Sequence, residues 1–120
     1  MNFIFDNDRP IYVQLVEQLT LYIVSGKLEP GSRLPSVRDL ALQTKVNPNT
    51  MQKALIELEN NQLVYTERTN GKFVTTNSEL IKSIKKQLAS RRVQEYLLNM
   101  EKLGVHKSDA IKYLQELGGE

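Results

Sequence analysis

The chain has 120 residues, of which 40% are hydrophobic and 25% charged, and its net charge is only +2. This is the composition of an ordinary globular protein, without the general basic excess that often marks a nucleic-acid binder. The chain has no cysteine and a single histidine, His106, which excludes disulfides, thiolate metal sites and cysteine nucleophiles. No apolar run approaches the roughly 20 residues of a membrane span, and no secretory signal begins the chain. We therefore expect a cytoplasmic protein with no membrane partner, no metal and no cofactor.

The first predicted helix follows a short N-terminal segment. Within residues 1–8, Phe3 and Phe5 alternate with polar neighbours, which suits a short edge strand. Asp8 is the expected N-cap of the helix, with Pro10 tolerated in its first turn, and Gly26 is its expected end. A core-facing side is predicted by apolar residues at every fourth position, namely Ile11, Leu15, Leu19 and Ile23.

Two shorter helices are predicted next. Ser36 is a plausible N-cap for the first, with Asp39 as an acidic variant of the capping box, and this helix stops near Thr44. Asn47 is a good N-cap for the second, with Pro48 at its first position. Only residues 45–47 join the two helices. A short joint of this kind is typical of a helix-turn-helix.

A β-hairpin is predicted after the third helix. Residues 63–67 and 72–76 are rich in β-branched and aromatic side chains, as strands are. Asn70 and Gly71 lie between the two runs, and Asn-Gly is the strongest short-range signal for a hairpin. Three helices followed by a hairpin are the elements of a winged helix-turn-helix.

The remaining residues form a different segment. Residues 77–103 contain a long helix that Ser78 can cap and Gly104 ends, and a last helix is expected from Ser108 to Leu117. The predicted fold is therefore mainly α with a small β-hairpin, as a winged helix-turn-helix followed by a two-helix tail. We place a DNA-binding domain at residues 1–76 and a helical dimerisation tail at residues 77–120.

The order of elements favours DNA binding. In a helix-turn-helix the second helix enters the major groove and presents its N-terminal residues to base edges, here Asn47, Asn49, Thr50, Gln52 and Lys53. Asparagine and glutamine can pair with adenine, and threonine can contact a thymine methyl group or a phosphate. The alternatives are that Asn47 is occupied as a cap and that Gln52 and Lys53 form an ordinary solvated face. Protein-binding winged helices share the same elements, so the pattern alone leaves DNA binding open.

Residues 10–76 closely resemble the DNA-binding domain of the GntR family of bacterial regulators. The first matching residues are Pro10-Ile11-Tyr12-x-Gln14-Leu15 and Gly26-x-Leu28-x-Pro30-Gly31-x-x-Leu34-Pro35-Ser36-Val37-Arg38-x-Leu40-Ala41. The match continues with Val46-Asn47-Pro48-Asn49-Thr50-Met51-x-x-Ala54-Leu55-x-x-Leu58-Glu59 and Gly71-x-Phe73-Val74. The short tail and the Asn-Pro-Asn-Thr run resemble the YtrA-type branch of the family.

The resemblance implies further DNA contacts. Ser36 and Arg38 match contact positions at the start of the second helix, and Arg38 would be the main base reader, with its fork on a guanine. Its alternative role is a surface salt bridge to Asp39 or Glu57. The positions in the recognition helix match those named above, from Asn47 to Lys53.

The resemblance also assigns roles to the wing, which is the hairpin and its turn. Asn70 and Gly71 match the wing tip that reaches into the minor groove, and Arg68 and Lys72 would hold phosphates beside it. The alternative for these two cations is a solvated cross-strand pair with Glu67.

Two positions depart from the family pattern. Gln62 stands where the family usually has glycine, which costs on the order of 1 kcal/mol if the site needs a positive φ. Thr69 replaces the first of two wing glycines. Both departures concern the path of the wing and not the fold.

The tail is too small to enclose a sizeable ligand pocket, and the resemblance implies that it dimerises the protein. Our candidates for the dimer interface are its apolar residues Ile81, Ile84, Leu88, Tyr96, Leu97, Met100, Ile111 and Leu114. The alternative is a tail that folds back on its own winged helix. Helix-turn-helix proteins usually read two half-sites about a two-fold axis.

The sequence can be interpreted as a DNA-binding regulator, a protein-interaction adaptor or an enzyme. The first is a repressor of its own operon, which the resemblance suggests could include ABC transporter genes, bound as a homodimer to an inverted-repeat operator in double-stranded DNA. A small-molecule effector could weaken that binding, but no sequence feature identifies one. The second is a protein-interaction winged-helix adaptor without DNA binding. An enzyme has no support, because the chain lacks a phosphate loop, a nucleophile-base pair and clustered carboxylates.

Overall fold

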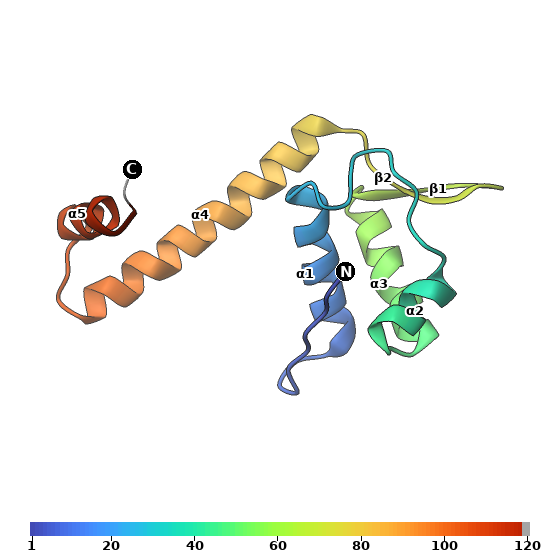
Figure 1. The fold of residues 1–120 in the computed structure, drawn as a ribbon, viewed down its shortest axis with the longest axis horizontal. Coiled ribbons are helices and arrows are strands. Elements are labelled where there is room, and N and C mark those ends of the chain that lie inside the picture. Colours follow the sequence, from blue (N-terminus) through green and yellow to red (C-terminus); the bar gives the residue numbers. More distant parts are fainter. Residues whose placement is uncertain (119–120) are drawn as a thin grey trace. The chain divides into compact units, whose positions relative to one another are not determined.

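The computed structural model describes residues 1–118, and their contacts divide the chain into a unit up to Ser83 and a unit from Ile84 onward. Five helices and one hairpin follow in the order (Figure 1) α1 (Ile11–Val24), α2 (Val37–Thr44), α3 (Pro48–Asn60), β1 (Val64–Glu67), β2 (Gly71–Val74), α4 (Ser78–Lys102) and α5 (Lys107–Gly118). The prediction of a mainly α fold with a small hairpin is confirmed.

The core of the first unit lies between α1 and α3. The two helices pack side by side, α2 packs against α3, and β1 lies against the end of α3 (Figure 1). Completely buried side chains come from every one of these elements and include Leu15, Leu19, Leu40, Met51, Leu55, Leu58 and Val64. Each such side chain contributes about 1.5–3 kcal/mol through its removal from water, so this core fixes the helices that carry the candidate site.

The caps of α2 and α3 agree with the sequence prediction. The Ser36 hydroxyl oxygen accepts a hydrogen bond from the Asp39 amide at 3.1 Å, and Asn47 Oδ1 accepts one from the Asn49 amide at 2.8 Å. Pro48 occupies the first turn of α3. Between the helices Lys45 adopts a left-handed conformation with φ of 58°. The joint of residues 45–47 is therefore a tight helix-turn-helix turn.

The hairpin is antiparallel and slightly shorter than predicted. Its register pairs Val64 with Val74 and Glu67 with Gly71. The segment before α2 runs beside β2, where Leu34 N donates to the Lys72 carbonyl at 2.8 Å and Val74 N donates to the Ser32 carbonyl at 2.9 Å. The wing is therefore hydrogen-bonded to the chain that leads directly into the helix-turn-helix.

The expected N-terminal edge strand is absent from residues 1–8, and side chains of α1 take the place of a strand partner. Gln14, Gln18 and Tyr22 are spaced by four residues and lie on one side of α1. Each pairs with both the N–H and the C=O of one residue in the N-terminal segment, at distances of 2.7–3.2 Å. Side chains of α1 thus form the hydrogen bonds that a neighbouring strand would otherwise form with the backbone of this segment.

Two predicted caps are wrong. Pro10, rather than Asp8, precedes α1 as its N-cap and offers no side-chain bond. For α4 the cap is Asn77 and not Ser78, because Asn77 Oδ1 accepts from the Leu80 amide at 3.1 Å. In both cases the observed N-cap lies one or two residues away from the residue predicted from the sequence.

The second unit consists of the later part of α4 and of α5. Gly104, with φ of 79°, follows the end of α4, and the Val105 amide donates to the Met100 carbonyl at 3.0 Å. Ala110 on α5 is completely buried. None of the helices in residues 1–118 combines the length and apolar character needed to cross a bilayer.

Candidate nucleic-acid interface

The helix-turn-helix presents one polar, solvent-accessible side. Met51, Ala54, Leu55 and Leu58 turn one face of α3 into the core. The opposite face leaves the predicted contact residues exposed or half-exposed, namely Asn47, Asn49, Thr50, Gln52 and Lys53. Their backbone is held by the core, so this polar face can meet another surface without rearrangement of the fold.

Arg38 lies exposed in the first turn of α2. Within residues 1–118 its guanidinium forms no ion pair with Asp39 or Glu57, the two partners that the alternative interpretation named. An arginine whose backbone is held in a helix and whose guanidinium is unpaired can bind a guanine edge or a phosphate through two parallel hydrogen bonds.

Two of the predicted contact residues on α3 also have partners inside the chain. Asn47 Oδ1 is engaged as the cap of α3, which leaves its amide hydrogens as the available donors. Lys53 Nζ lies 3.9 Å from the centroid of the Tyr12 ring on α1. A cation over an aromatic face is held with on the order of 0.5–1 kcal/mol at an exposed site, so Tyr12 restrains the position of the Lys53 ammonium group.

Lys72 on the wing is engaged with α3. Its ammonium group donates to Glu59 Oε2 at 3.4 Å and to Thr66 Oγ1 at 2.9 Å, and the Thr66 hydroxyl donates to Glu59 Oε1 at 2.5 Å. The Thr66 hydrogen bond and the Lys72 charge lower the pKa of the Glu59 carboxyl group. The expected alternative pair with Glu67 is not formed, because Lys72 reaches across to α3 instead.

The wing tip follows the Asn-Gly prediction. Asn70 Nδ2 donates to Glu67 Oε2 at 3.2 Å, and Gly71 has φ of 102°. Thr69, which replaces a family glycine, does not need a positive φ. Gln62, which stands where the family usually has glycine, adopts a positive φ of 65°. One departure from the family pattern is therefore strained and the other is not.

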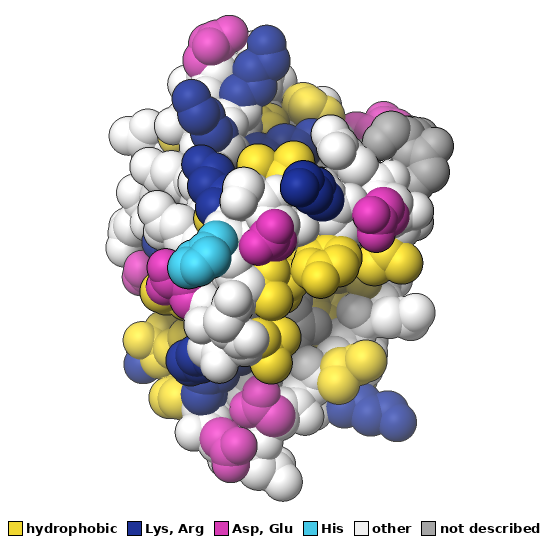
Figure 2. Space-filling model, turned by 90° about the vertical axis from the view of Figure 1, so that its left-hand side faces the viewer, with side chains coloured by type: hydrophobic (Ala, Val, Ile, Leu, Met, Phe, Trp, Pro, Cys, Tyr) yellow, Lys and Arg dark blue, Asp and Glu magenta, His cyan; other side chains and the backbone are white. Residues whose placement is uncertain are grey.

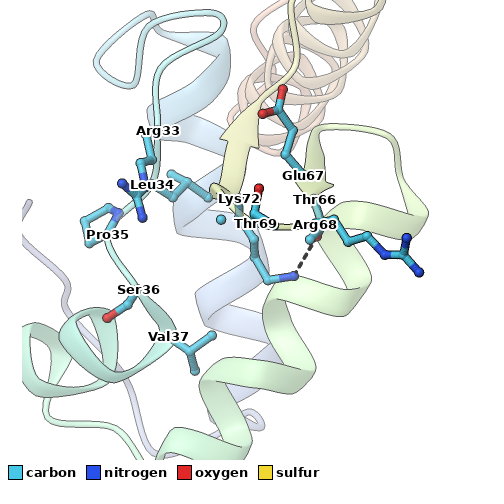
Figure 3. Close-up of a pocket in the computed structure, with 11 residues that line it drawn as sticks. Arg33, Leu34, Pro35, Ser36, Val37, Thr66, Glu67, Arg68, Thr69 and Lys72 are labelled. Atoms are coloured by element: carbon cyan, nitrogen blue, oxygen red, sulfur yellow. Dashed lines mark hydrogen bonds between the residues drawn. The ribbon is translucent and has the colours of Figure 1, made fainter.

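A hollow separates the wing from the start of α2, and we call it the notch. Its volume is about 390 Å³, and Figure 3 shows the side chains around it. Those with polar or charged side chains are Arg33, Ser36, Thr66, Glu67, Arg68, Thr69 and Lys72. In Figure 3 the Arg68 side chain extends away from Arg33. The notch brings together predicted site residues of α2 and the wing that are separated by about thirty positions in the sequence.

Arg33 is the residue of this site that sequence reasoning missed. It falls at an unspecified position of the matched pattern, between Gly31 and Leu34. The only available signal was a basic residue beside the Leu-Pro-Ser run, which by itself is indistinguishable from a solvated loop charge. Its place in the notch depends on the pairing of this segment with β2, which no local pattern reports.

Comparison with known proteins decides the family. Residues 11–74 match the model for "Bacterial regulatory proteins, gntR family". The chain belongs to the GntR family. The match spans α1 to β2, the same elements that carry the polar face and the notch.

Relatives and solved structures extend the likeness beyond the winged helix. The uncharacterized HTH-type transcriptional regulator YhcF of Bacillus subtilis is 36% identical over 108 residues, which cover 90% of this chain and 89% of that protein. The HTH-type transcriptional repressor YtrA of the same organism is 29% identical and covers 92% and 86%. A GntR family transcriptional regulator from Listeria monocytogenes aligns with a TM-score of 0.85 at 37% identity, over 93% and 98% of the two chains.

One solved neighbour was captured with DNA. AraR(DBD) in complex with operator ORX1 aligns over 62% of this chain with a TM-score of 0.57 and 28% identity. Together with the family match, this identifies the chain as a GntR family transcription regulator with a DNA-binding domain. Its relatives are regulators and not enzymes.

The predicted dimer interface of this GntR family chain lies along α4 and α5. Its members are half-exposed on α4 and exposed on α5, where Ile111 and Leu114 are 45% and 55% accessible. Hydrophobic side chains also lie open among charged ones on the face that Figure 2 shows. Within residues 84–118, the apolar side chains other than Ala110 are therefore incompletely buried.

Proposed function

We propose that this GntR family regulator binds a specific operator sequence through α2, α3 and the wing. The residues that would touch DNA are those predicted from the sequence: Ser36, Arg38, Asn47, Asn49, Thr50, Gln52, Lys53, Arg68, Asn70, Gly71 and Lys72. The observation that carries the proposal is the exposed guanidinium of Arg38 in the first turn of α2, together with a polar α3 face that the core holds outward. In a helix-turn-helix such a face lies along the floor of the major groove.

Two chains would read one operator. Ile81, Ile84, Leu88, Tyr96, Leu97, Met100, Ile111 and Leu114 would bury their side chains against a second copy, with the tail of residues 77–120 as the dimerisation element. The incomplete burial of these residues supports this role, since exposed apolar area gains free energy when it is covered. A dimer whose two winged helices are related by a two-fold axis matches an inverted repeat in DNA.

We further propose that binding represses transcription, by occlusion of the promoter of the protein's own operon. The relative YtrA of Bacillus subtilis is a transcriptional repressor, which supports this direction of regulation. The YtrA-type resemblance suggests ABC transporter genes in that operon. A repressor of this kind acts on chromosomal DNA, which places it in the cytoplasm.

The test uses a duplex recovered by selection from a random pool and a set of its single-base variants. Arg38→Ala should lose about 1–3 kcal/mol of binding free energy per chain and relax specificity at one base position in each half-site. Arg9→Ala is the matched control, because it also removes an arginine from the first unit, where Arg9 pairs with Glu17 at 2.8 Å. Equal affinities for all base variants before and after Arg38→Ala would contradict the proposal and favour an adaptor.

A further inference from the structure

Arg33 is held at the notch by its backbone. It forms an isolated antiparallel bridge with Phe73 of β2, and its neighbour Leu34 donates to the Lys72 carbonyl at 2.8 Å. The segment that carries Arg33 therefore behaves as a third strand of the wing. This fixes the base of the Arg33 side chain relative to both the wing and the start of α2.

Gly71 leaves space for the guanidinium end of Arg33 beside the wing. A Cβ atom at position 71 would lie 3.2 Å from Arg33 Nε, which is tighter than most Cβ contacts, and 3.4 Å from one of its terminal nitrogens. Gly71 also has φ of 102°. The glycine thus serves the wing turn and also leaves room for the Arg33 guanidinium to lie against the backbone.

Arg33 is the notch cation whose backbone is held by β2 while its guanidinium stays open. Lys72 is engaged by Glu59 and Thr66, and Arg68 extends away from Arg33 (Figure 3). The one carboxylate in the lining, Glu67, accepts from Asn70 and points away from Ser36 in the same view. Within residues 1–118, Arg33 is exposed and no carboxylate pairs with its guanidinium.

We propose that Arg33 is a further DNA contact, which holds a backbone phosphate of the operator in the notch between α2 and the wing. Its planar fork suits two phosphate oxygens. Such a contact fixes the register of the protein on the duplex and carries no sequence information. This inference rests on the proposed DNA binding and names one more residue of that surface.

The test measures the salt dependence of binding for the full chain. A contact with one phosphate contributes about 0.9 to the slope of log K against log salt concentration. Because two chains bind each duplex, Arg33→Gln should therefore reduce the magnitude of the slope by about 1.8, or about 0.9 per chain, with the same proportional loss of affinity on the selected operator and on a mixed-sequence duplex. Arg33→Lys, which retains the charge, should retain most of the slope.

Lys27→Gln is the matched control. It removes one positive charge from the same unit, at a residue that lies near the Tyr22 ring and does not line the notch. Its slope should equal that of the wild type. Thermal unfolding of all three variants should match the wild type, because the substituted side chains are exposed.

The outcomes separate this inference from the proposed function. If the wild type binds both duplexes and Arg33→Gln leaves the slope unchanged, the phosphate contact is wrong and operator binding stands. If the wild type binds no duplex, both are wrong. If inorganic phosphate shifts the Arg33 Nε–H resonance, assigned by its loss in Arg33→Gln, while the duplex does not, the notch takes a small anion and the inference is overturned.

Discussion

The two units of the chain bury their apolar residues to very different extents. Up to Ser83, three helices and a hairpin enclose a core whose leucines, such as Leu15, Leu40 and Leu55, are completely inaccessible to solvent. In residues 84–118, Ala110 is the single side chain buried to that extent. A winged helix that satisfies its own core can serve as a rigid reading head, whereas the tail has apolar area to cover. This contrast supports a division into a DNA-reading unit and an assembling unit.

The largest expected effect is the loss of the core of the first unit. Leu55→Ala should lower the free energy of unfolding by about 2–5 kcal/mol, because it opens a cavity where α3 packs against its neighbours. Chemical denaturation measures the change. Leu98→Ala, at a residue that is 58% exposed on α4, should change stability by less than about 0.5 kcal/mol. Comparable losses in the two variants would remove the contrast between the units.

A second substitution addresses the assembling unit. Leu114→Glu should weaken dimerisation by about 2 kcal/mol, or roughly thirtyfold, because it places a charge in an apolar interface. Sedimentation measures the dimer dissociation constant. Lys112→Glu changes an exposed residue of the same helix that is not an interface candidate, and it should have a much smaller effect. A dimer that is indifferent to Leu114→Glu would place the interface elsewhere.

Gln62 offers a smaller, stabilising test within the first unit. Its φ of 65° is a conformation that costs a non-glycine residue on the order of 1–2 kcal/mol, partly offset by the greater chain entropy that glycine loses on folding. Gln62→Gly should therefore raise the free energy of unfolding by about 0.5–1 kcal/mol, measured by thermal unfolding. The same substitution at Gln52, within α3, should be destabilising. A loss of stability at both positions would mean that position 62 carries no strain.

The smallest effect is a pH dependence at the base of the wing. The pKa of Glu59 is lowered from its usual 4.5 by the Thr66 hydrogen bond and the Lys72 charge. A carboxyl group with a depressed pKa contributes stability that is present above pH 4.5 and is lost as the pH falls through the folded-state pKa. Glu59→Gln should flatten the stability profile below about pH 4.5, whereas Glu57→Gln on the same helix should not. Parallel stability profiles for the wild type and Glu59→Gln would mean that the contacts of Glu59 with Thr66 and Lys72 do not stabilise the folded state.

The local features of the reading head could be predicted from the sequence. Ser36 and Asn47 act within three residues of themselves, and Asn-Gly acts within one turn, so short patterns determine them. The features that escaped prediction depend on distant parts of the chain. Gln14 holds Asp6 from the next element, Lys72 reaches Glu59 across 13 positions, and Arg33 is placed by its pairing with β2. Lys72 pairs with Glu59 in the fold, whereas Arg33 pairs with no carboxylate within residues 1–118. The sequence does not distinguish these two cations.

In the proposed complex, two chains dimerise through their tails and their two winged helices bind one DNA duplex. The most direct measurement is selection of bound duplexes from a random pool by the full chain, followed by the mass of the complex with the selected sequence. We expect the selected sequence to be an inverted repeat and the complex to contain two chains on each duplex. A single unrepeated site with one chain bound, or the absence of any enriched sequence, would contradict it.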